Sequence, residues 1–415
     1  MITHLRQKYN GSFSERSYHS LVSWLTEQAG VAPKFQVSET PVFIPKYLKE
    51  RLLEAGNDII KVITSNHFFE HAPKGLPAGQ AVPRRTEHPL FLQMDFGLCL
   101  DETGKTIPQL VEAQGFPSLY FFQDMLAAGY RKFFDIPDHF TSRFGGLGVD
   151  EYHQLLSDCI LDGNDPAEVA LLEVEPDQQT TQIDFELASR RLGIPILCIS
   201  DLKRSGRKLF YRKEGKDIPV RRIFNRVIFD ELLKRDDLDL QFSMIEEVDV
   251  SWAGHPDWFA MLSKHTLPLF DSQYVPRSYF VSDVLGEITH PDSRSSRPRE
   301  RISSFGERLD LRKYVLKPLY SFAGQGVNLS PTEDDLKNIP DPENYILQKK
   351  VSYEPLIETL DEPARAEVRM MYLWPPEKDE PILINNLVRL SKGKMVGVRY
   401  NKGKQWVGGS IGYFE

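Results

Sequence analysis

A chain of 415 residues is too long for one hydrophobic core and predicts two or three domains of ordinary size. Hydrophobic residues make up 41% and charged residues 27% of it, as in folded globular proteins, and the net charge of −8 argues against a nucleic-acid partner. The three cysteines, Cys99, Cys159 and Cys198, fit no metal-binding spacing, so we expect a reducing, cytoplasmic compartment without structural disulfides. No signal peptide is evident and no stretch approaches the ~18 apolar residues of a membrane helix, so no membrane partner is expected.

The first predicted part, residues 1–160, begins with helices and continues into a hairpin. SYHSLVSWLTEQAG and PKYLKERLLEAGNDIIKVI both space their apolar residues as helices do. After a Pro- and Gly-rich connector (residues 73–83), the pattern changes to strand, turn and strand: PLFLQMDFGLCL, DETGKT and IPQLVEAQGF. SLYFFQDMLAAGYRKFF then predicts another helix, and FGGLGVDE is interpreted as a turn because no strand precedes it.

Residues 161–290 predict a middle α/β domain, and residues 304–415 a third part rich in strands. In the middle, AEVALLEV, KLFYRK and IPVRRIFNRVIF are strands, while the helix IDFELASRRLG ends on Gly193 before the strand IPILCIS. The polar stretch at 290–303 is expected to be an exposed linker. The third part holds the predicted strands YVLKP, YILQKKV, AEVRMMYLW, PILINNLVRLS and KMVGVRYN.

The segment YVLKPLYSFAGQGVNL carries the strongest local signal for chemistry. A strand delivers Lys317, Pro318 ends it, and a small-residue loop follows from Ser321 to Gly326, before a second strand. Glycines let backbone N–H groups approach phosphate oxygens, and a neighbouring lysine adds a point charge to the same phosphates. The alternative is a hairpin with an exposed lysine.

YILQKKVSYEPL follows one hairpin later. Its strand carries Gln348 and Lys349, and Val351 precedes a bend. We interpret this segment as a hinge that offers backbone hydrogen bonds to an adenine edge, with Lys349 reaching back to phosphate. The alternative is an edge strand with exposed lysines.

A second signal lies in the predicted hairpin. Asp95 and Glu112 fall side by side on its two strands, and Gln114 lies on the same face as Glu112. Two carboxylates and an amide oxygen are hard ligands suited to a Mg²⁺ ion that bridges nucleotide phosphates. The alternative is an edge strand whose acidic side chains face water.

Together these segments resemble the ATP-grasp superfamily. The sequence VLKPLYSFAGQGVNL is especially similar to the corresponding segment of the circularly permuted branch that includes glutathionylspermidine synthase. In an ordinary ATP-grasp protein the acidic strands follow the lysines. Here the D-F pair at Asp95 and the E-x-Q pair at Glu112 precede Lys317, and the chain stops at WVGGSIGYFE, about where acidic strands would otherwise begin. One cut and rejoining of the chain produces both features. The resemblance covers residues 89–120 and 310–415, and the middle part more loosely.

The resemblance implies ATP and Mg²⁺ as cofactors and a role for each matching residue. Asp95, Glu112 and Gln114 would hold Mg²⁺, and either Arg389 or Arg399 would steady the transferring phosphoryl group. The residues expected to bind ATP are Lys317, Ser321, Gly324, Gln325, Gly326, Gln348, Lys349 and Val351. The sequence departs from the family in having Gln114 in place of Asn, and Gln93 where the closest branch tends to carry Arg.

Two further candidates lie outside these segments. His67, Glu70 and His71 form H-x-x-E-H, a spacing known from zinc proteases, but Pro73 follows and no third ligand is evident, so a capped helix end is expected instead. Arg226, at a strand end of the middle part, is a candidate for binding a substrate carboxylate, with a structural ion pair as the alternative.

The sequence therefore predicts an α/β (α+β) fold: a circularly permuted ATP-grasp with a middle Rossmann-like strand–helix domain. The expected activity is ATP-dependent ligation of a small-molecule or peptide carboxylate to an amine through an acyl phosphate. A small-molecule kinase and a non-catalytic ATP-binding regulator are the alternatives. The substrates and the oligomeric state are left open.

Overall fold

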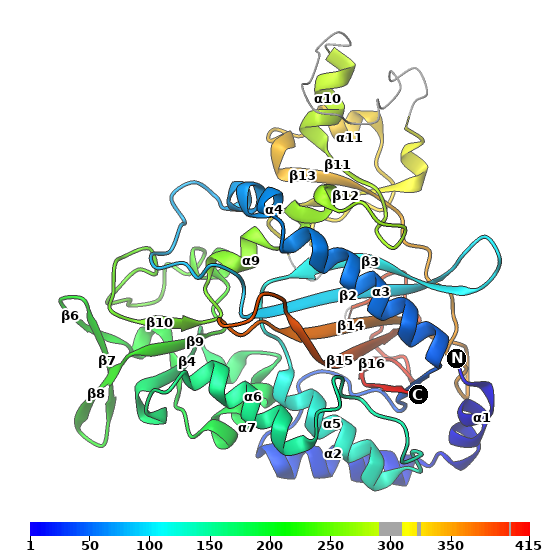
Figure 1. Ribbon diagram of the computed structural model, residues 1–415, viewed down its shortest axis with the longest axis horizontal. Coiled ribbons are helices and arrows are strands. Elements are labelled where there is room, and N and C mark those ends of the chain that lie inside the picture. The colour runs from blue at the N-terminus through cyan, green and yellow to red at the C-terminus, as the bar shows by residue number, and fades with distance from the viewer. Residues whose placement is uncertain (290–308, 322–324, 398–399) are drawn as a thin grey trace.

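The computed structural model describes residues 1–289, 309–321, 325–397 and 400–415 (Figure 1). Two of the predicted site residues, Gly324 and Arg399, and the expected linker at 290–303 lie outside the described residues.

An antiparallel five-stranded sheet lies at the centre of the molecule (Figure 1). It combines strands from residues 91–114 with strands from residues 365–410. Its strand order is β16 (Gly408–Ser410), β15 (Ile382–Ser391), β14 (Arg365–Leu373), β2 (Phe91–Leu100) and β3 (Thr106–Gln114). The predicted hairpin is thus confirmed as β2 and β3, and β2 pairs with β14 from the far end of the sequence. The tertiary fold, not chain proximity, completes this sheet.

Helix α3 (Lys46–Ile63) covers one face of the central sheet and crosses in front of it in Figure 1. Side chains alternate between the two faces of a strand, so every second residue of β2 and β14 points towards this helix. The apolar residues that form this core are Leu48, Leu52, Ile59, Leu92, Met94, Phe96, Val368, Met370 and Tyr372. The opposite face therefore receives the intervening side chains, which include the polar residues of β2 and β14.

A smaller antiparallel sheet lies above the central one in Figure 1. It has the order β11 (Ser278–Phe280), β13 (Tyr345–Lys349) and β12 (Tyr314–Pro318), and it carries α10 (Val281–Thr289) and α11 (Glu333–Lys337). Its own small core consists of Val281, Val284, Tyr314, Leu316, Leu336 and Leu347. β11 pairs with β13 although the sequence division places it in the middle part.

The middle part contains a parallel sheet with the order β10 (Ser251–Ala253), β9 (Arg222–Asn225), β4 (Val169–Glu173) and β5 (Ile196–Cys198). Helix α7 (Gln182–Leu192) connects β4 to β5 and ends, as predicted, where Gly193 adopts the left-handed conformation. Beside it lies an antiparallel sheet of β6 (Lys203–Ser205), β7 (Lys208–Lys213) and β8 (Lys216–Val220).

The remaining helices cover the lower side of the molecule in Figure 1 or connect its layers. They are α1 (Thr3–Ser12), α2 (Glu15–Ala29), α4 (Asn66–His71), α5 (Tyr120–Phe133), α6 (Val149–Leu161), α8 (Phe229–Leu232) and α9 (Asp257–Met261). Near the C-terminus, β17 (Gly412–Phe414) pairs in parallel with β1 (Val42–Ile44), directly before α3. The segment WVGGSIGYFE therefore lies next to the helical segment that precedes Pro89, as one cut and rejoining of the chain requires.

Most predicted elements are present, including α2, α3, α5 and α7. The prediction of a strand in KMVGVRYN is wrong for the residues that are described, because residues 394–397 form bends. The second strand expected after the small-residue loop is reduced to one bridge between Leu316 and Asn328. All three cysteines are free thiols. Among the described residues, no helix combines the length and the apolar character needed for a membrane span.

Candidate functional site

A cavity of about 1220 Å³ lies between the central sheet and the upper sheet. Pockets for one small ligand usually measure about 300–1,000 Å³, so this cavity is larger than a single small ligand requires. The polar face of the central sheet lines it with Glu112, Gln114, Glu367, Arg369 and Arg389, and the upper sheet with Val315, Lys317 and Gln348. Residues from β3 and β12, far apart in the sequence, therefore face the same space.

Lys317 projects from β12 into the cavity because Tyr314 and Leu316, on the opposite face, belong to the core of the upper sheet. Its Nζ lies 3.5 Å from the Val111 carbonyl of β3. Burial lowers the pKa of Lys317 to about 8, although the Glu112 carboxylate acts in the opposite direction. Lys317 is partly buried, and an anionic partner in the cavity would favour its protonated form.

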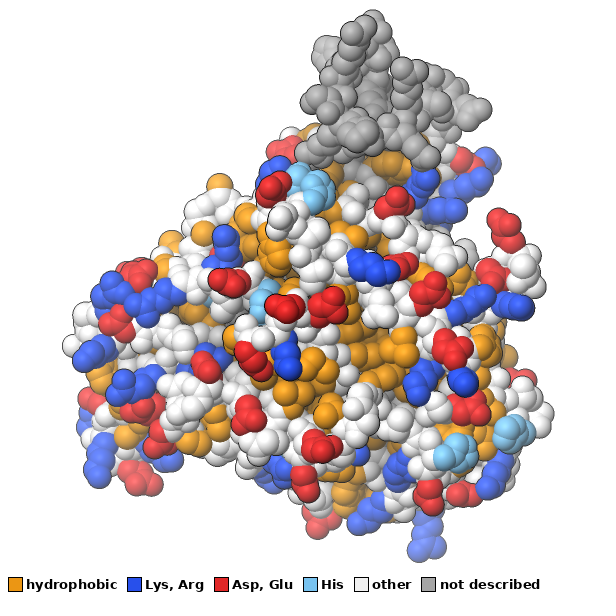
Figure 2. Space-filling model, viewed as in Figure 1, with side chains coloured by type: hydrophobic (Ala, Val, Ile, Leu, Met, Phe, Trp, Pro, Cys, Tyr) orange, Lys and Arg blue, Asp and Glu red, His pale blue; other side chains and the backbone are white. Residues whose placement is uncertain are grey.

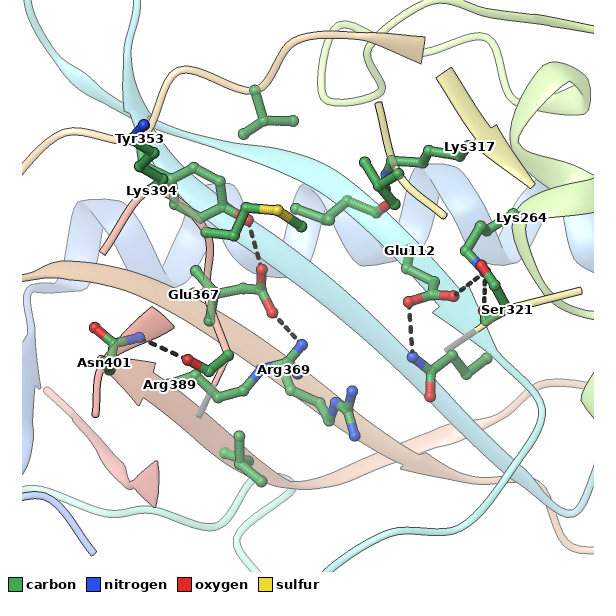
Figure 3. A pocket seen from close by; sticks show the side chains of 18 of the residues that line it. Glu112, Lys264, Lys317, Ser321, Tyr353, Glu367, Arg369, Arg389, Lys394 and Asn401 are labelled. Carbon is green, nitrogen blue, oxygen red and sulfur yellow. Dashed lines mark hydrogen bonds and ion pairs between the residues drawn. The ribbon is translucent and has the colours of Figure 1, made fainter. Parts of the chain in front are cut away.

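Lys264, in the 3-10 turn Lys264–Leu269, is a second buried cation on this side of the cavity. Its ammonium donates to the carbonyl oxygens of Leu319 and Ser321, and lies 3.4 Å from Ser321 Oγ. Its Nζ is also 3.8 Å from Glu112 Oε1. Figure 3 shows Lys264 between Glu112 and Ser321, so this lysine ties the start of the small-residue loop to the acidic strand β3.

Glu112 and Gln114 lie on one face of β3, as the period of two predicts, and both line the cavity. The Gln114 amide donates to Glu112 Oε2 at 3.1 Å. Asp95 is the register partner of Glu112 on β2, so the predicted side-by-side arrangement of the two acids is confirmed for the backbone. A carboxylate and an amide thus converge at the cavity wall, which is a donor set of the kind Mg²⁺ takes.

Asp95 differs from Glu112 in its surroundings because it is almost fully buried and its oxygens accept from two arginines. Arg369 Nη2 donates to Oδ2 at 2.7 Å, and Arg389 Nη2 donates to the same oxygen at 2.6 Å. Gln93 accepts a further hydrogen bond from Arg369 at 2.8 Å. Burial opposes ionisation of Asp95, but the two guanidinium groups outweigh it and hold the pKa of Asp95 below its usual value.

Glu367 completes this network at the cavity floor. It accepts hydrogen bonds from Arg389 and from the Tyr353 hydroxyl, as Figure 3 shows. Burial raises the pKa of Tyr353 well above its usual value, so this phenol remains a donor. A Cβ at Gly97 would lie 2.8 Å from both Tyr353 and Val351, so only glycine at this point of β2 lets the segment after β13 approach the sheet.

The residues predicted to bind ATP divide between the cavity and the surface. Those that line it are Lys317, Ser321, Gln348 and Val351. Lys349 is exposed and faces away, whereas its neighbour Lys350 lines the cavity. The described residues Gln325 and Gly326 are exposed and lie outside the lining. Gly326 has a φ of +68°, and a Cβ there would meet Pro318 at 2.9 Å, so the turn requires glycine.

Arg226 does not line the cavity and is buried directly after the end of β9. It is 4% exposed, and its guanidinium lies over the rings of Phe116 and Phe185, at 4.8 and 5.3 Å. Burial lowers its pKa, and the carboxylates of Asp184 and Glu173 oppose that shift. Among the described residues the guanidinium forms no ion pair with a carboxylate, and its Nε and Nη1 are buried without a hydrogen-bond partner. The structural ion pair is therefore not observed, and substrate binding by Arg226 stays a prediction.

Positive charge dominates the cavity lining. The basic residues of the lining are Lys264, Lys317, Lys350, Arg369, Arg389, Lys394 and Lys402. Among the described lining residues, only Glu112 and Glu367 are acidic. On the face seen in Figure 2, by contrast, acidic and basic side chains are interspersed. A protein of net negative charge thus has a cavity whose lining is predominantly basic, which would attract an anion.

Comparisons with known proteins identify the fold. No protein-family model and no curated protein matches the chain. Among solved structures, it is similar to a glutathione synthetase-like effector from Globodera pallida, determined in the apo form, with a TM-score of 0.56. The alignment covers 96% of each chain at 10% sequence identity. The chain therefore has an α+β, glutathione synthetase-like fold.

Several cavity residues escaped the sequence analysis. Lys264 follows no motif, and Lys350 lies within the predicted hinge but was given no role of its own there. Glu367 and Arg369 lie on a strand whose sequence carries no motif. One signal was available for the strand pair: AEVRMMYL alternates charged and apolar residues in its first half, which is typical of a strand with one polar face. Nothing in the sequence indicated what that face meets.

Proposed function

We propose that this chain is an ATP-dependent carboxylate–amine ligase of the circularly permuted ATP-grasp type, which acts through an acyl phosphate. One observation carries the proposal: the acidic strand β3 and the lysine strand β12, far apart in the sequence, face each other across a single cavity. The glutathione synthetase-like fold supports it, because it spans nearly the whole chain. The pairing of β17 with β1 supports the permuted order of segments.

The residues of the upper sheet would bind the nucleotide. Val315, Val351 and the buried Gln348 line the part of the cavity suited to a flat, partly apolar base. Lys317 and Lys350 would neutralise the phosphates, and Lys264 would hold the start of the small-residue loop in place through the Ser321 carbonyl. Burial lowers the pKa of Lys317 to about 8, and a phosphate beside it would favour the protonated ammonium.

Magnesium fits the wall formed by Glu112 and Gln114, because one carboxylate and one amide are hard oxygen donors. The ion would neutralise charge on the transferring phosphoryl group. Asp95 as a metal ligand stays a prediction. Its three contacts with Arg369 and Arg389 favour a different role, in which it positions these arginines at the cavity floor.

In the proposed reaction, a substrate carboxylate oxygen attacks the γ-phosphorus of ATP, and the bond from that phosphorus to ADP breaks. The amine then attacks the acyl carbon of the acyl phosphate, inorganic phosphate leaves, and the amine gives up a proton. Arg389, hydrogen-bonded to Glu367, would stabilise negative charge that builds up during phosphoryl transfer. No nucleophilic side chain is needed, since both nucleophiles come from the substrates.

A non-catalytic ATP-binding regulator is the second candidate. It is favoured by the same ion pairs, because Asp95 is already neutralised by arginines, and by Gln93, which accepts from Arg369 where the branch tends to carry Arg. The two candidates make opposite predictions for turnover but the same prediction for ATP binding.

The test combines calorimetric ATP titration with ADP and phosphate assays on panels of carboxylic acids and amines. A ligase binds Mg·ATP and releases phosphate only when an acid and an amine are both present. ADP formation with a single substrate would instead identify a kinase, and ATP binding without any turnover would favour the regulator. Absence of ATP binding would contradict all three.

A further inference from the structure

Helix α4, outside the cavity, presents three possible metal ligands to solvent. The helix begins where Ser65 accepts a hydrogen bond from Phe68 N at 3.2 Å, and the Phe68 side chain is buried. This anchoring fixes the helix and leaves His67 and Glu70 exposed and His71 partly exposed. The helix ends after His71, as a 3-10 turn begins at the next residue, so both histidines belong to it.

Spacing brings the three side chains together. Residues three and four apart lie on the same helix face, so His67, Glu70 and His71 share one side of α4. Their ligand atoms all lie within 4.8 Å of one another, and the two imidazole centroids are 4.2 Å apart. Ligands at the ~2.0–2.2 Å of zinc bonds lie a little over ~3 Å from each other, so small rotations of exposed side chains suffice.

A hydrogen bond to the backbone determines which nitrogen of the His71 ring carries the proton. Its Nδ1 lies 2.8 Å from the His67 carbonyl oxygen, which can only accept, so Nδ1 carries the proton. The lone pair that coordinates metals then belongs to Nε2. Histidines that bind metals usually donate their other ring N–H to a backbone carbonyl or carboxylate in this way, which fixes the tautomer and the ring plane.

From these observations we infer that α4 carries a binding site for a divalent transition metal ion, with Zn²⁺ as the best match. Two imidazole nitrogens and one carboxylate oxygen favour zinc over Mg²⁺, which prefers oxygen ligands throughout. Glu70 is the third ligand, which the sequence analysis did not count, and the fourth tetrahedral position faces solvent. The inference is independent of the proposed ligase activity, because it uses residues outside the ATP cavity.

The site lies beside a contact between the 3-10 turn that follows α4 (Ala72–Gly75) and the cavity wall. The Tyr320 hydroxyl, at the start of the small-residue loop, donates to the Gly75 carbonyl at 3.1 Å. The His265 ring hydrogen-bonds to the His71 backbone, and His265 is the neighbour of Lys264. A bound ion would link side chains at the end of α4. It would thereby restrain the following 3-10 turn, which contacts the cavity wall through Gly75.

The experiment is a calorimetric Zn²⁺ titration of the tag-free protein in millimolar Mg²⁺, which occupies oxygen-only sites. We expect one Zn²⁺ per chain, at least about tenfold weaker binding in His67→Ala and in His71→Ala, and no binding at α4 in the double variant. Zn²⁺ should also raise the melting temperature of the wild type but not that of the double variant. Because these side chains are exposed, far-UV circular dichroism should show intact folding in every variant.

His139→Ala is the matched control, since this histidine is also exposed and lies elsewhere. It should bind Zn²⁺ as the wild type does. Failure of the wild type to bind Zn²⁺, or equal binding by the double variant, would overturn the site. Unchanged affinity in Glu70→Ala would overturn the three-ligand arrangement.

Discussion

The two faces of the central sheet are made by the same strands and have opposite chemistry. Towards α3, residues such as Met94 and Met370 form a fully buried apolar core. Towards the cavity, their neighbours Asp95 and Arg369 form buried ion pairs. Because side chains alternate between the two faces of a strand, one segment supplies both the apolar core and the polar wall of the cavity. Substitutions one residue apart should therefore affect different properties, and the predictions below test that separation.

Asp95→Asn should have the largest effect on stability. Removing this charge leaves the buried guanidinium of Arg369 without its carboxylate, which costs roughly 3–5 kcal/mol, whereas Arg389 is 37% exposed and keeps Glu367 as a partner. Urea denaturation measures the loss. If Asp95 positions the arginines, the Mg²⁺ concentration for half-maximal activity should not change in the folded variant. A large rise in that concentration would support Asp95 as a metal ligand instead.

Met94→Ala tests the apolar face. Met94 is fully buried beneath α3, so truncation should lower the free energy of unfolding by about 2–5 kcal/mol. The dissociation constant of ATP, measured below the unfolding transition, should stay within twofold of the wild-type value. A tenfold loss of ATP affinity would show that the two faces are not separable.

Glu112→Gln should leave stability almost unchanged and reduce turnover by about 100-fold or more, a loss of ~2.7 kcal/mol in transition-state stabilisation. The side chain lies at the cavity wall, where it contacts Gln114 and Lys264 rather than the core. Steady-state kinetics at several Mg²⁺ concentrations provides the measurement. Wild-type turnover at limiting Mg²⁺ would remove Glu112 from the proposed metal site.

Lys317→Met should weaken ATP binding by about tenfold, the loss of one charge-assisted contact of ~1.5 kcal/mol. Because the pKa of Lys317 is about 8, ATP affinity of the wild type should fall as the pH rises through 8, and the variant should lack this step. Between pH 8 and 10.5 the unfolded state holds the proton that the folded state has lost. The free energy of unfolding should therefore rise with pH in that window for the wild type only.

The smallest effects should distinguish two adjacent lysines. Lys350 lines the cavity, so Lys350→Ala should weaken ATP binding several-fold, while Lys349→Ala should change it by less than twofold. Calorimetry on the two variants gives a matched pair, since each loses one lysine from the same segment. The reverse order would restore the assignment of Lys349 made from the sequence.

Local patterns in the sequence were sufficient for most elements. Helical spacing predicted α3 and α5, and the turn DETGKT between two apolar runs predicted the hairpin of β2 and β3. Failures occurred where a segment lacks a ladder partner. KMVGVRYN has the composition of a strand, but its described residues form bends, because strand formation needs hydrogen bonds from a neighbour as well as propensity.

For the site, the sequence indicated which residue types are present but not which way their side chains point. Lys349 and Lys350 are adjacent residues of the same type, so the sequence does not distinguish them. Only the pairing of β13 with β12 decides which of the two faces the cavity. Asp95 and Glu112 were predicted as equals. In the structure one is covered by arginines from β14 and β15 and the other lies at the cavity wall, because their partners come from distant segments.

The sequence by itself determined the α+β class, the hairpin with its two acids, the strand lysine before a small-residue loop, and their unusual order along the chain. These features are local, and the periods of strands and helices express them directly. Only the tertiary structure decided that β2 pairs with β14, that Lys264 joins the loop to Glu112, and that the acidic and basic strands share one cavity. Such contacts depend on how the sheets pack and in which register their strands pair. Burial of apolar surface stabilises the whole arrangement of layers rather than any one segment, so no local pattern reveals these contacts.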